Sequence, residues 1–445
     1  MNVSIRSRIA MAMLAALTPL TSGAALGQAR PAATALSPSV GPSLPKIDGV
    51  FRYALSASEL LQTGYGSGVG FSTVLSGDAN YSSRSEVHPF SMSYAGGLMM
   101  GNQYGRTATT FQNFSVSQGL VAGSWLLGVS DSVSYLPQSP TLGLSGIPGV
   151  GDLGPYPTQG PGSGPAGGVI TNNMTSVTNS LSGNIERRLT ALTSISGMGG
   201  WTILRYPSSD FGLDNTQKMG QVNLNHRLDL RDTISGGVSY STFDFGKGID
   251  LSMQTRGING SFQRVLSRLL SMSISAGPQW INSSNKLLLP NRTTVSVDAS
   301  LNYVRELTSA SLNYSRGVNG GSGVQPGAIS DSVGASIGRS YGREWMASLT
   351  ANYTKSDGLL NPGAFTRPLT GAQALLYSGG NSNSVYGGLQ VTRRLTDALS
   401  AYGSYNLQHQ STSYILRTQN AFSGTSSTFG FGITYSPRAR RLGMF

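Results

Sequence analysis

The sequence predicts an all-β protein, a transmembrane antiparallel up-and-down β-barrel of about 18 strands, with about 16 as the alternative. The first observation is a two-residue alternation of apolar and polar residues, clearest from Leu389 to Leu407 on both sides of Thr396-Asp397. Such alternation gives a strand one apolar and one polar face. The second is a turn with arginine followed by leucine, which recurs about every 40 residues, the length of two strands and two connections. The recurring leucines are Leu189, Leu228, Leu266 and Leu307.

The third observation is the low content of charged residues. Of 445 residues, 38% are hydrophobic and 11% are charged, whereas globular domains carry about 25% charge. Ser, Thr, Asn, Gln and 59 glycines occupy the polar positions, which suits strands whose polar side faces confined water. After the first 20 residues, no run of apolar residues reaches the roughly 18 that a transmembrane helix requires, so a helical membrane protein is excluded. The absence of cysteine rules out a disulfide scaffold.

The chain is basic, with 31 Lys and Arg against 19 Asp and Glu and a formal net charge of +12. A basic excess of this size indicates an anionic partner: nucleic acid, lipopolysaccharide or an anionic solute. The arginines recur singly near turns and form no basic run, so we expect no nucleic acid partner. The alternative reading is that the arginines form only a solvated rim.

The first residues predict export. Arg6 and Arg8 precede an apolar stretch from Ile9 to Leu20, and small residues follow at a plausible cleavage point, a pattern typical of a secretory signal peptide. The expected segments are a signal peptide over 1–27, a Pro/Ala-rich periplasmic linker over 28–49, the transmembrane barrel over 50–437 and a basic C-terminal tail ending in Phe over 438–445.

Strands long enough to span a membrane at a tilt are predicted along the whole barrel. They cover residues 50–60, 70–82, 88–99, 109–118, 124–136, 174–187, 191–205, 215–227, 232–245, 250–264, 268–282, 292–305, 308–319, 327–340, 345–356, 382–395, 398–410 and 425–437. Tight connections alternate with loose ones, of which Pro137 to Ile170 and Asp357 to Gly380 are long. Outer-membrane barrels show this asymmetry, with tight periplasmic turns and long extracellular loops.

The two faces of each strand differ in a way that soluble sheets do not. The polar parity carries small neutral groups and hardly any Lys or Glu, residues with which soluble sheets protect a solvated face. We therefore expect an apolar outside and a polar lumen. Two aromatic girdles are predicted, with Trp125 and Trp345 just after tight turns and Trp201 and Trp280 near the opposite strand ends.

With these patterns the sequence, from Val50 to Phe445, resembles Gram-negative outer-membrane β-barrels. The Arg-Leu-Ser/Thr turn before a Ser/Tyr alternating strand is most similar to the β-barrel porins associated with exopolysaccharide loci. The resemblance implies signal-dependent export to the outer membrane, contact with outer-membrane lipid and lipopolysaccharide, assembly by the barrel assembly machinery, and an exopolysaccharide export system as a partner. Phe429 and Phe431 lie in a final alternating strand similar to the assembly signal, but a basic stretch separates this strand from Phe445.

Candidate pore-lining residues are the polar ones on the lumen parity and the arginines at the turns. They are Asp298, Asn302, Asn223, Asn225, Arg227, Arg394, Asn406 and Asn352. Asp298 either lines the pore or pairs with a neighbouring arginine. The longest connection holds seven prolines and one charge, so it is predicted to fold over the barrel mouth or to pack on a partner protein. Its constriction candidates are Leu142, Ile147, Asp152 and Tyr156.

The sequence predicts no enzyme, catalytic residue, cofactor or metal site. His88 and His226 lie at turns, which leaves His409-Gln410-Ser411. This triplet shares the outward parity of Leu407 and is similar to the Ser–His pair of outer-membrane phospholipase. Because a His-x-Ser triplet arises often by chance, a lipid hydrolase is only a remote alternative.

Two functions remain open. The first is a porin-like channel for small solutes or an exported polysaccharide, with a modest anion preference from the arginines. The second is a plugged barrel that serves as a surface scaffold or receptor. Either barrel should be heat-modifiable, migrating differently in detergent gels before and after boiling, and helical circular dichroism would contradict both.

Overall fold

The protein is described by a computed structural model that covers residues 48–64, 69–101, 108–138, 174–207, 213–246, 251–321, 326–361, 380–412 and 423–442. Within these ranges every element is a β-strand, and no helix is long and apolar enough to cross a membrane. The strands are β1 (Gly49–Thr63), β2 (Gly70–Ser83), β3 (Phe90–Gly101), β4 (Ala108–Ala122), β5 (Trp125–Gln138), β6 (Met174–Arg188), β7 (Thr193–Arg205), β8 (Asn215–Arg227), β9 (Asp232–Phe245), β10 (Leu251–Val265), β11 (Leu270–Ser283), β12 (Arg292–Arg305), β13 (Thr308–Asn319), β14 (Ala328–Tyr341), β15 (Trp345–Gly358), β16 (Asn381–Arg394), β17 (Leu399–Thr412), β18 (Gly424–Tyr435) and β19 (Arg440–Leu442). The predicted signal peptide and Phe445 lie outside the described residues.

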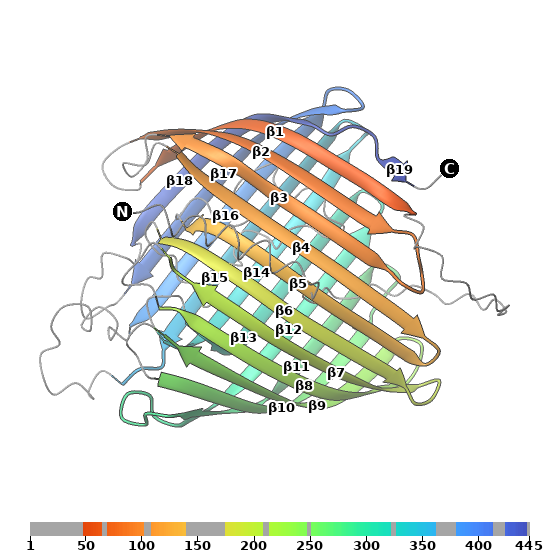
Figure 1. The fold of residues 1–445 in the computed structure, drawn as a ribbon, viewed down its shortest axis with the longest axis vertical. Helices are drawn as coiled ribbons and strands as arrows, with labels where there is room; N and C mark the ends of the chain where they lie inside the picture. The colour runs from red at the N-terminus through yellow and green to blue at the C-terminus, as the bar shows by residue number, and fades with distance from the viewer. Residues whose placement is uncertain are drawn as a thin grey trace, which may run out of the picture.

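The sheet closes on itself. From β1 to β18 each strand pairs antiparallel with its successor, and β18 also pairs with β1, where Leu55 lies opposite Tyr435. The strands are strongly tilted around this closed wall (Figure 1). The short β19 pairs with the start of β1, so part of the segment predicted as a basic tail lies in the sheet. The predicted fold class, an antiparallel all-β barrel of 18 long strands, is confirmed.

The strands begin and end within a few residues of the predicted positions. β5 runs two residues further than expected and includes Pro137, which was predicted to lie in the following loop. Pairing of β5 with β4 ends at Tyr135, whereas pairing with β6 continues to Gln138. Pro137 therefore occupies an edge position, where a proline is tolerated in a sheet.

The two faces of the wall differ in exposure and polarity. On β18, Phe429 and Phe431 are 49% and 64% exposed, whereas Ser426 and Thr428 are buried. The same alternation continues on the neighbouring strands, because the antiparallel register places residues of one face opposite one another. The exposed apolar side chains point outward and the polar ones inward, the inverse of a soluble barrel.

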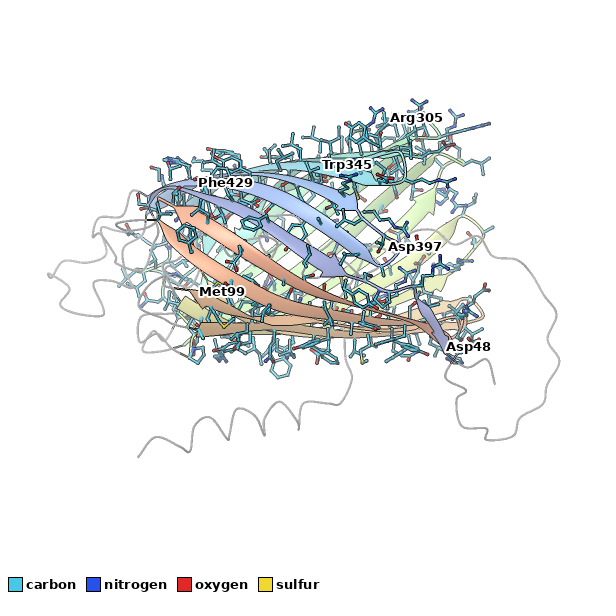
Figure 2. The ribbon with its side chains drawn as sticks, turned by 90° about the horizontal axis from the view of Figure 1, so that it is seen from above. Asp48, Met99, Arg305, Trp345, Asp397 and Phe429 are labelled. Carbon is cyan, nitrogen blue, oxygen red and sulfur yellow. The ribbon has the colours of Figure 1, made fainter. Side chains whose placement is uncertain are left out.

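The tight turns repeat one local structure. Thr190 Oγ1 accepts hydrogen bonds from the N–H groups of Leu192 and Thr193, and Thr396 Oγ1 accepts two in the same way from Ala398 and Leu399. Such side-chain bonds hold a short turn in place of a backbone ladder. The recurrent Arg-Leu-Thr signal thus has a physical basis. Asp48, Arg305 and Asp397 lie at one end of the barrel, which is the end with the tight turns (Figure 2).

An ion-pair cluster stabilises the turn beside the closing seam. The Asp397 carboxylate is 3.1 Å from Arg394 Nη2 and also binds the guanidinium of Arg438, which follows β18. The hydrogen bond and the charge of Arg438, together with the charge of Arg394, hold the pKa of Asp397 below its ordinary value of 3.8. The last turn is thereby linked to the chain that leads into β19.

We expect Asp397→Asn to destabilise this seam at neutral pH and to have little effect in acid. A carboxylate with a lowered pKa stabilises the folded state above pH 3.8, its ordinary pKa, and this contribution is lost as the pH falls through the folded-state pKa. Hydrogen exchange of β18 and β19 in wild type and variant, measured at pH 7 and near pH 2, checks this. A difference that is as large near pH 2 as at pH 7 would contradict the ion-pair explanation.

Candidate functional site

The inner wall of the barrel is lined mainly by amides and hydroxyls. All eight predicted pore-lining residues lie on the inward face by the strand register: Asp298, Asn302, Asn223, Asn225, Arg227, Arg394, Asn406 and Asn352. Serine pairs join neighbouring strands on the same face, as between Ser93 and Ser115 at 2.6 Å and between Ser273 and Ser300 at 2.7 Å. The wall therefore presents small neutral groups.

The inward amides are held in place by their neighbours. Asn225 Nδ2 donates to Ser196 Oγ over 3.1 Å, and Asn406 Oδ1 accepts a 2.7 Å hydrogen bond from the Tyr386 hydroxyl. Asn223 Oδ1 accepts a bond from Gln221 Nε2 at 2.9 Å. Each amide still has capacity for a further partner. The wall can thus exchange hydrogen bonds with a polar molecule in the lumen.

Among the charged lumen candidates, the two arginines lie near the turns. Arg394 donates to Asp397 and to the carbonyl oxygen of Thr396 in its own turn, so it belongs to the rim. Arg227 ends β8 at the same end of the barrel. Asp298 lies in mid-strand and forms no ion pair with any residue in the described ranges. Asp298 was predicted either to line the pore or to pair with a neighbouring arginine, and the pairing is not observed among the described residues.

A buried apolar cluster lies at the loop end of the inner wall, and we call it the mouth cluster. It consists of Leu213, Phe243, Phe245, Leu251, Met253, Ile281, Leu289, Leu359 and Leu360. Phe243 and Met253 are inward-facing on β9 and β10, whereas Leu289 and Leu359 come from the connections after β11 and β15. Sequence reasoning missed this cluster, although the inward parity of Phe243 and Phe245, opposite to that of Val238 and Tyr240, was a signal for it.

Backbone hydrogen bonds join the connections over the mouth cluster. Asn361 N donates to Leu288 O over 2.8 Å, and Leu359 N donates to Gly327 O over 3.2 Å. The segment 284–291 folds as a turn in which Asn285 Oδ1 accepts the N–H groups of Leu287 and Leu288. Connections that lie several strands apart thus form one packed unit over the inner wall.

A second inward apolar group lies on β1 to β5. Leu60, Val74 and Phe111 are buried there, with Met99 and Leu136 packed against them. Figure 2 places Met99 toward the end opposite the tight turns. The predicted constriction residues Leu142, Ile147, Asp152 and Tyr156 lie outside the described residues.

All four predicted girdle tryptophans point outward. Trp125 and Trp345 lie at the turn end, where the guanidinium carbons of Arg187 and Arg393 are 5.0 and 5.1 Å from the ring centroids. Trp201 and Trp280 lie toward the loop ends of β7 and β11. Arginine stacked on tryptophan combines an apolar body with a charge that stays in water, as an interface with lipid headgroups requires.

The outer face also carries ionic groups that sequence reasoning missed. Arg316 binds both oxygens of Asp331 at 2.8 Å, Tyr314 donates to the same carboxylate at 2.9 Å, and Lys355 lies 3.1 Å from Asp357. These pairs lie near the loop ends of β13 to β15. If the alternation of faces had been counted residue by residue from each tight turn, these charged side chains would have been assigned to the outer face.

The histidine–serine triplet does not form a nucleophile–base pair. His409 and Ser411 both face outward on β17, as expected from their parity. However, His409 Nδ1 lies 2.7 Å from Thr425 Oγ1, and no hydrogen bond joins His409 to Ser411 among the bonds of the described residues. The structure gives the hydrolase alternative no support.

Comparisons with known proteins find similarity at the level of the fold. No protein-family model matches the chain, and no curated protein does. Pseudomonas aeruginosa OccK2 (OpdF) is 9% identical, with a TM-score of 0.41, over 87% of this chain and 97% of that one. P. aeruginosa OprD is 9% identical over 87% and 95% of the two chains, with a TM-score of 0.38. The ferric-catecholate import receptor Fiu from E. coli K12 is 10% identical over 88% and 82%, with a TM-score of 0.40.

Proposed function

We propose that the chain is a porin-like channel in the outer membrane of a Gram-negative bacterium. The observation that supports this most strongly is a closed barrel of 18 long strands with an apolar outer face and a neutral, hydroxyl- and amide-rich inner face. Barrels of about 16–18 strands leave room for an aqueous channel. The tight turns would face the periplasm, after export directed by the predicted signal peptide and insertion by the barrel assembly machinery.

The solutes that suit this lumen are small, neutral and rich in hydroxyl groups, and an exported polysaccharide has the same chemistry. Fixed amides such as Asn225 and Asn406 can replace the water around a sugar hydroxyl without binding it strongly, because they carry no charge. We expect the mouth cluster to narrow the entrance. Association with an exopolysaccharide export system is part of this proposal.

We expect purified protein in a planar bilayer to open steps of conductance with a modest preference for anions, because rim arginines such as Arg227 make the local potential positive. Arg227→Gln should shift the reversal potential toward zero in a KCl gradient. Lys355→Gln, on the outer face, is the control and should leave it unchanged. Clear cation selectivity would contradict the prediction and place the effect of the arginines outside the pore.

The second candidate is a plugged barrel that acts as a surface scaffold or receptor. The mouth cluster favours it, because Leu289 and Leu359 are almost fully buried where an open channel would hold water. The same bilayer recording separates the two functions. A heat-modifiable, correctly folded barrel that never opens would support the plugged barrel against the channel.

A further inference from the structure

An apolar groove runs along the outer face of the barrel from β5 to β11. It has a volume of about 980 Å³ and is walled by outward side chains such as Leu127, Val129, Ile185, Val222 and Ile258. Ligand pockets in proteins have volumes of about 300–1,000 Å³. No aspartate or glutamate lines the groove. It is therefore large enough for a ligand and apolar along its length.

Three glycines form the floor of the groove. Gly183 lies opposite Gly199, and Gly199 lies opposite Gly220, all on the outward parity. A Cβ atom on Gly199 would come no closer than 3.8 Å to a neighbouring backbone atom, so a side chain would fit there. The groove is deep here because these positions lack side chains. A larger residue at one of these glycines would therefore fill it.

The groove rises across the barrel wall. One row in register runs from Val129 across the three glycines to Tyr240, Arg256 and Trp280. Val129 is four residues from the turn end of β5, whereas Trp280 is ten residues from the turn end of β11. The groove thus begins deep in the apolar band of the wall and ends at the outer aromatic girdle.

Two cations lie at the upper end of this groove. Arg256 lines it, and Lys218 is two residues above Gly220 on β8. Arg256 is nine residues from the turn end of β10, and Lys218 is nine from the turn end of β8. At about 3.3 Å per residue and a tilt of about 40°, nine residues rise about 23 Å. This height matches the upper edge of an apolar band about 25 Å tall.

These two cations have no anionic partner among the residues that the structure describes. In the outer half of the exterior wall, Arg205, Arg316 and Lys355 each pair with a carboxylate. Lys218 and Arg256 are exposed and form no ion pair or hydrogen bond with any residue in the described ranges. Cations at the edge of a membrane favour anionic lipid headgroups. A ligand with an anionic head and an apolar chain would therefore match both the two cations and the apolar groove.

We propose that this groove binds a phosphorylated glycolipid of the outer leaflet, of the lipid A type, with a phosphate between Lys218 and Arg256 and an acyl chain over Gly220, Gly199 and Gly183. The inference rests on the proposed outer-membrane placement, since that placement puts the loop ends of the strands in the outer leaflet. Tyr240 and Trp280 lie beside the phosphate position, at the level that aromatic residues occupy in membrane interfaces.

The test is lipid retention by the full mature barrel, measured by native mass spectrometry after exchange into detergent with added lipid A or phosphatidylglycerol. We expect retention of one lipid A in preference to phosphatidylglycerol. Each of Arg256→Gln and Lys218→Gln should weaken retention about fivefold, since a basic residue at an anionic surface contributes about 1 kcal/mol. Lys355→Gln, whose cation is already paired with Asp357, is the control.

The groove is tested separately by Gly199→Leu, which fills its floor without touching the cations. It should abolish retention, whereas Gly387→Leu on β16, outward-facing with nothing within 4 Å of its Cβ position, should not. Heat modifiability confirms the fold of each variant, and conductance in the same preparation reports the proposed channel independently. No preference for lipid A, unchanged retention by Gly199→Leu, or dimerisation through this face in place of lipid binding would overturn the proposal.

Discussion

Replacing Gly277 by valine is expected to prevent stable closure of the barrel wall between β10 and β11. A Cβ atom at this position would overlap the carbonyl oxygen of Ile258 and lie 2.8 Å from the Cα of Asn259. Both obstacles are backbone atoms, so no side-chain rotation relieves the overlap. Pairs are formed at Gly257–Gln279 and Gly260–Ala276 but not between them, where Pro278 has no N–H to donate to the ladder. The free energy of unfolding should fall by about 3 kcal/mol or more.

The control for this substitution is Gly317→Val on β13. Gly317 also faces inward, two residues from the end of β13, and nothing lies within 4 Å of its Cβ position, so valine should be neutral or slightly stabilising there. Urea unfolding and the gel shift on boiling measure both variants. If Gly277→Val unfolds at the same urea concentration as wild type, the backbone of β10 is free to move and the tight fit is wrong.

The fold was predictable because its signals are local. In a strand such as β15, Leu349 and Ala351 alternate with Thr350 and Asn352, and this period alone assigns the two faces. The turns carry their own chemistry, as at Thr396, whose hydroxyl accepts the N–H groups of Ala398 and of Leu399, the first residue of the next strand. Each hairpin is therefore specified by residues that lie close together in the sequence. Closure follows once the hairpins are placed side by side.

The packing over the mouth was not predictable, because its contacts join distant parts of the chain. Leu359 packs with Met253 only because the curvature of the wall and the course of two connections bring them together. A single sequence does not contain the distance in space between Leu359 and Met253. It could have noticed that Phe243 and Phe245 are apolar on the inward parity, which a lumen filled only with water would not favour.

The lumen candidates were placed on the inward face by parity, but their partners could not be predicted. Arg394 shares that parity, yet its guanidinium is bound within its own turn. The heights of Lys218 and Arg256 were equally hidden, because relative height depends on the register between neighbouring strands. The face on which a residue lies follows from the alternation within its own strand. Its electrostatic partners depend on how the neighbouring strands are aligned in the sheet.

Replacing Leu289 by alanine is expected to release the segment 284–291 from the inner wall and to raise the conductance of the channel. Leu289 is completely buried in the mouth cluster, so the substitution should cost about 2–5 kcal/mol of local stability. The hydrogen bond from Asn361 N to Leu288 O would then open more often. Deuterium should consequently enter the Asn361 amide faster, and single-channel steps should become larger and noisier.

Leu287→Ala is the matched control, because Leu287 lies in the same turn but is 78% exposed. Its removal leaves the mouth cluster intact, so exchange and conductance should both remain at wild-type values. Faster exchange in Leu289→Ala with unchanged conductance would mean that the mouth cluster seals a part of the wall that solutes do not pass. If neither measurement changes, Leu289 does not hold the segment in place. Larger steps in Leu289→Ala alone would identify the mouth cluster as the structural element that limits flow.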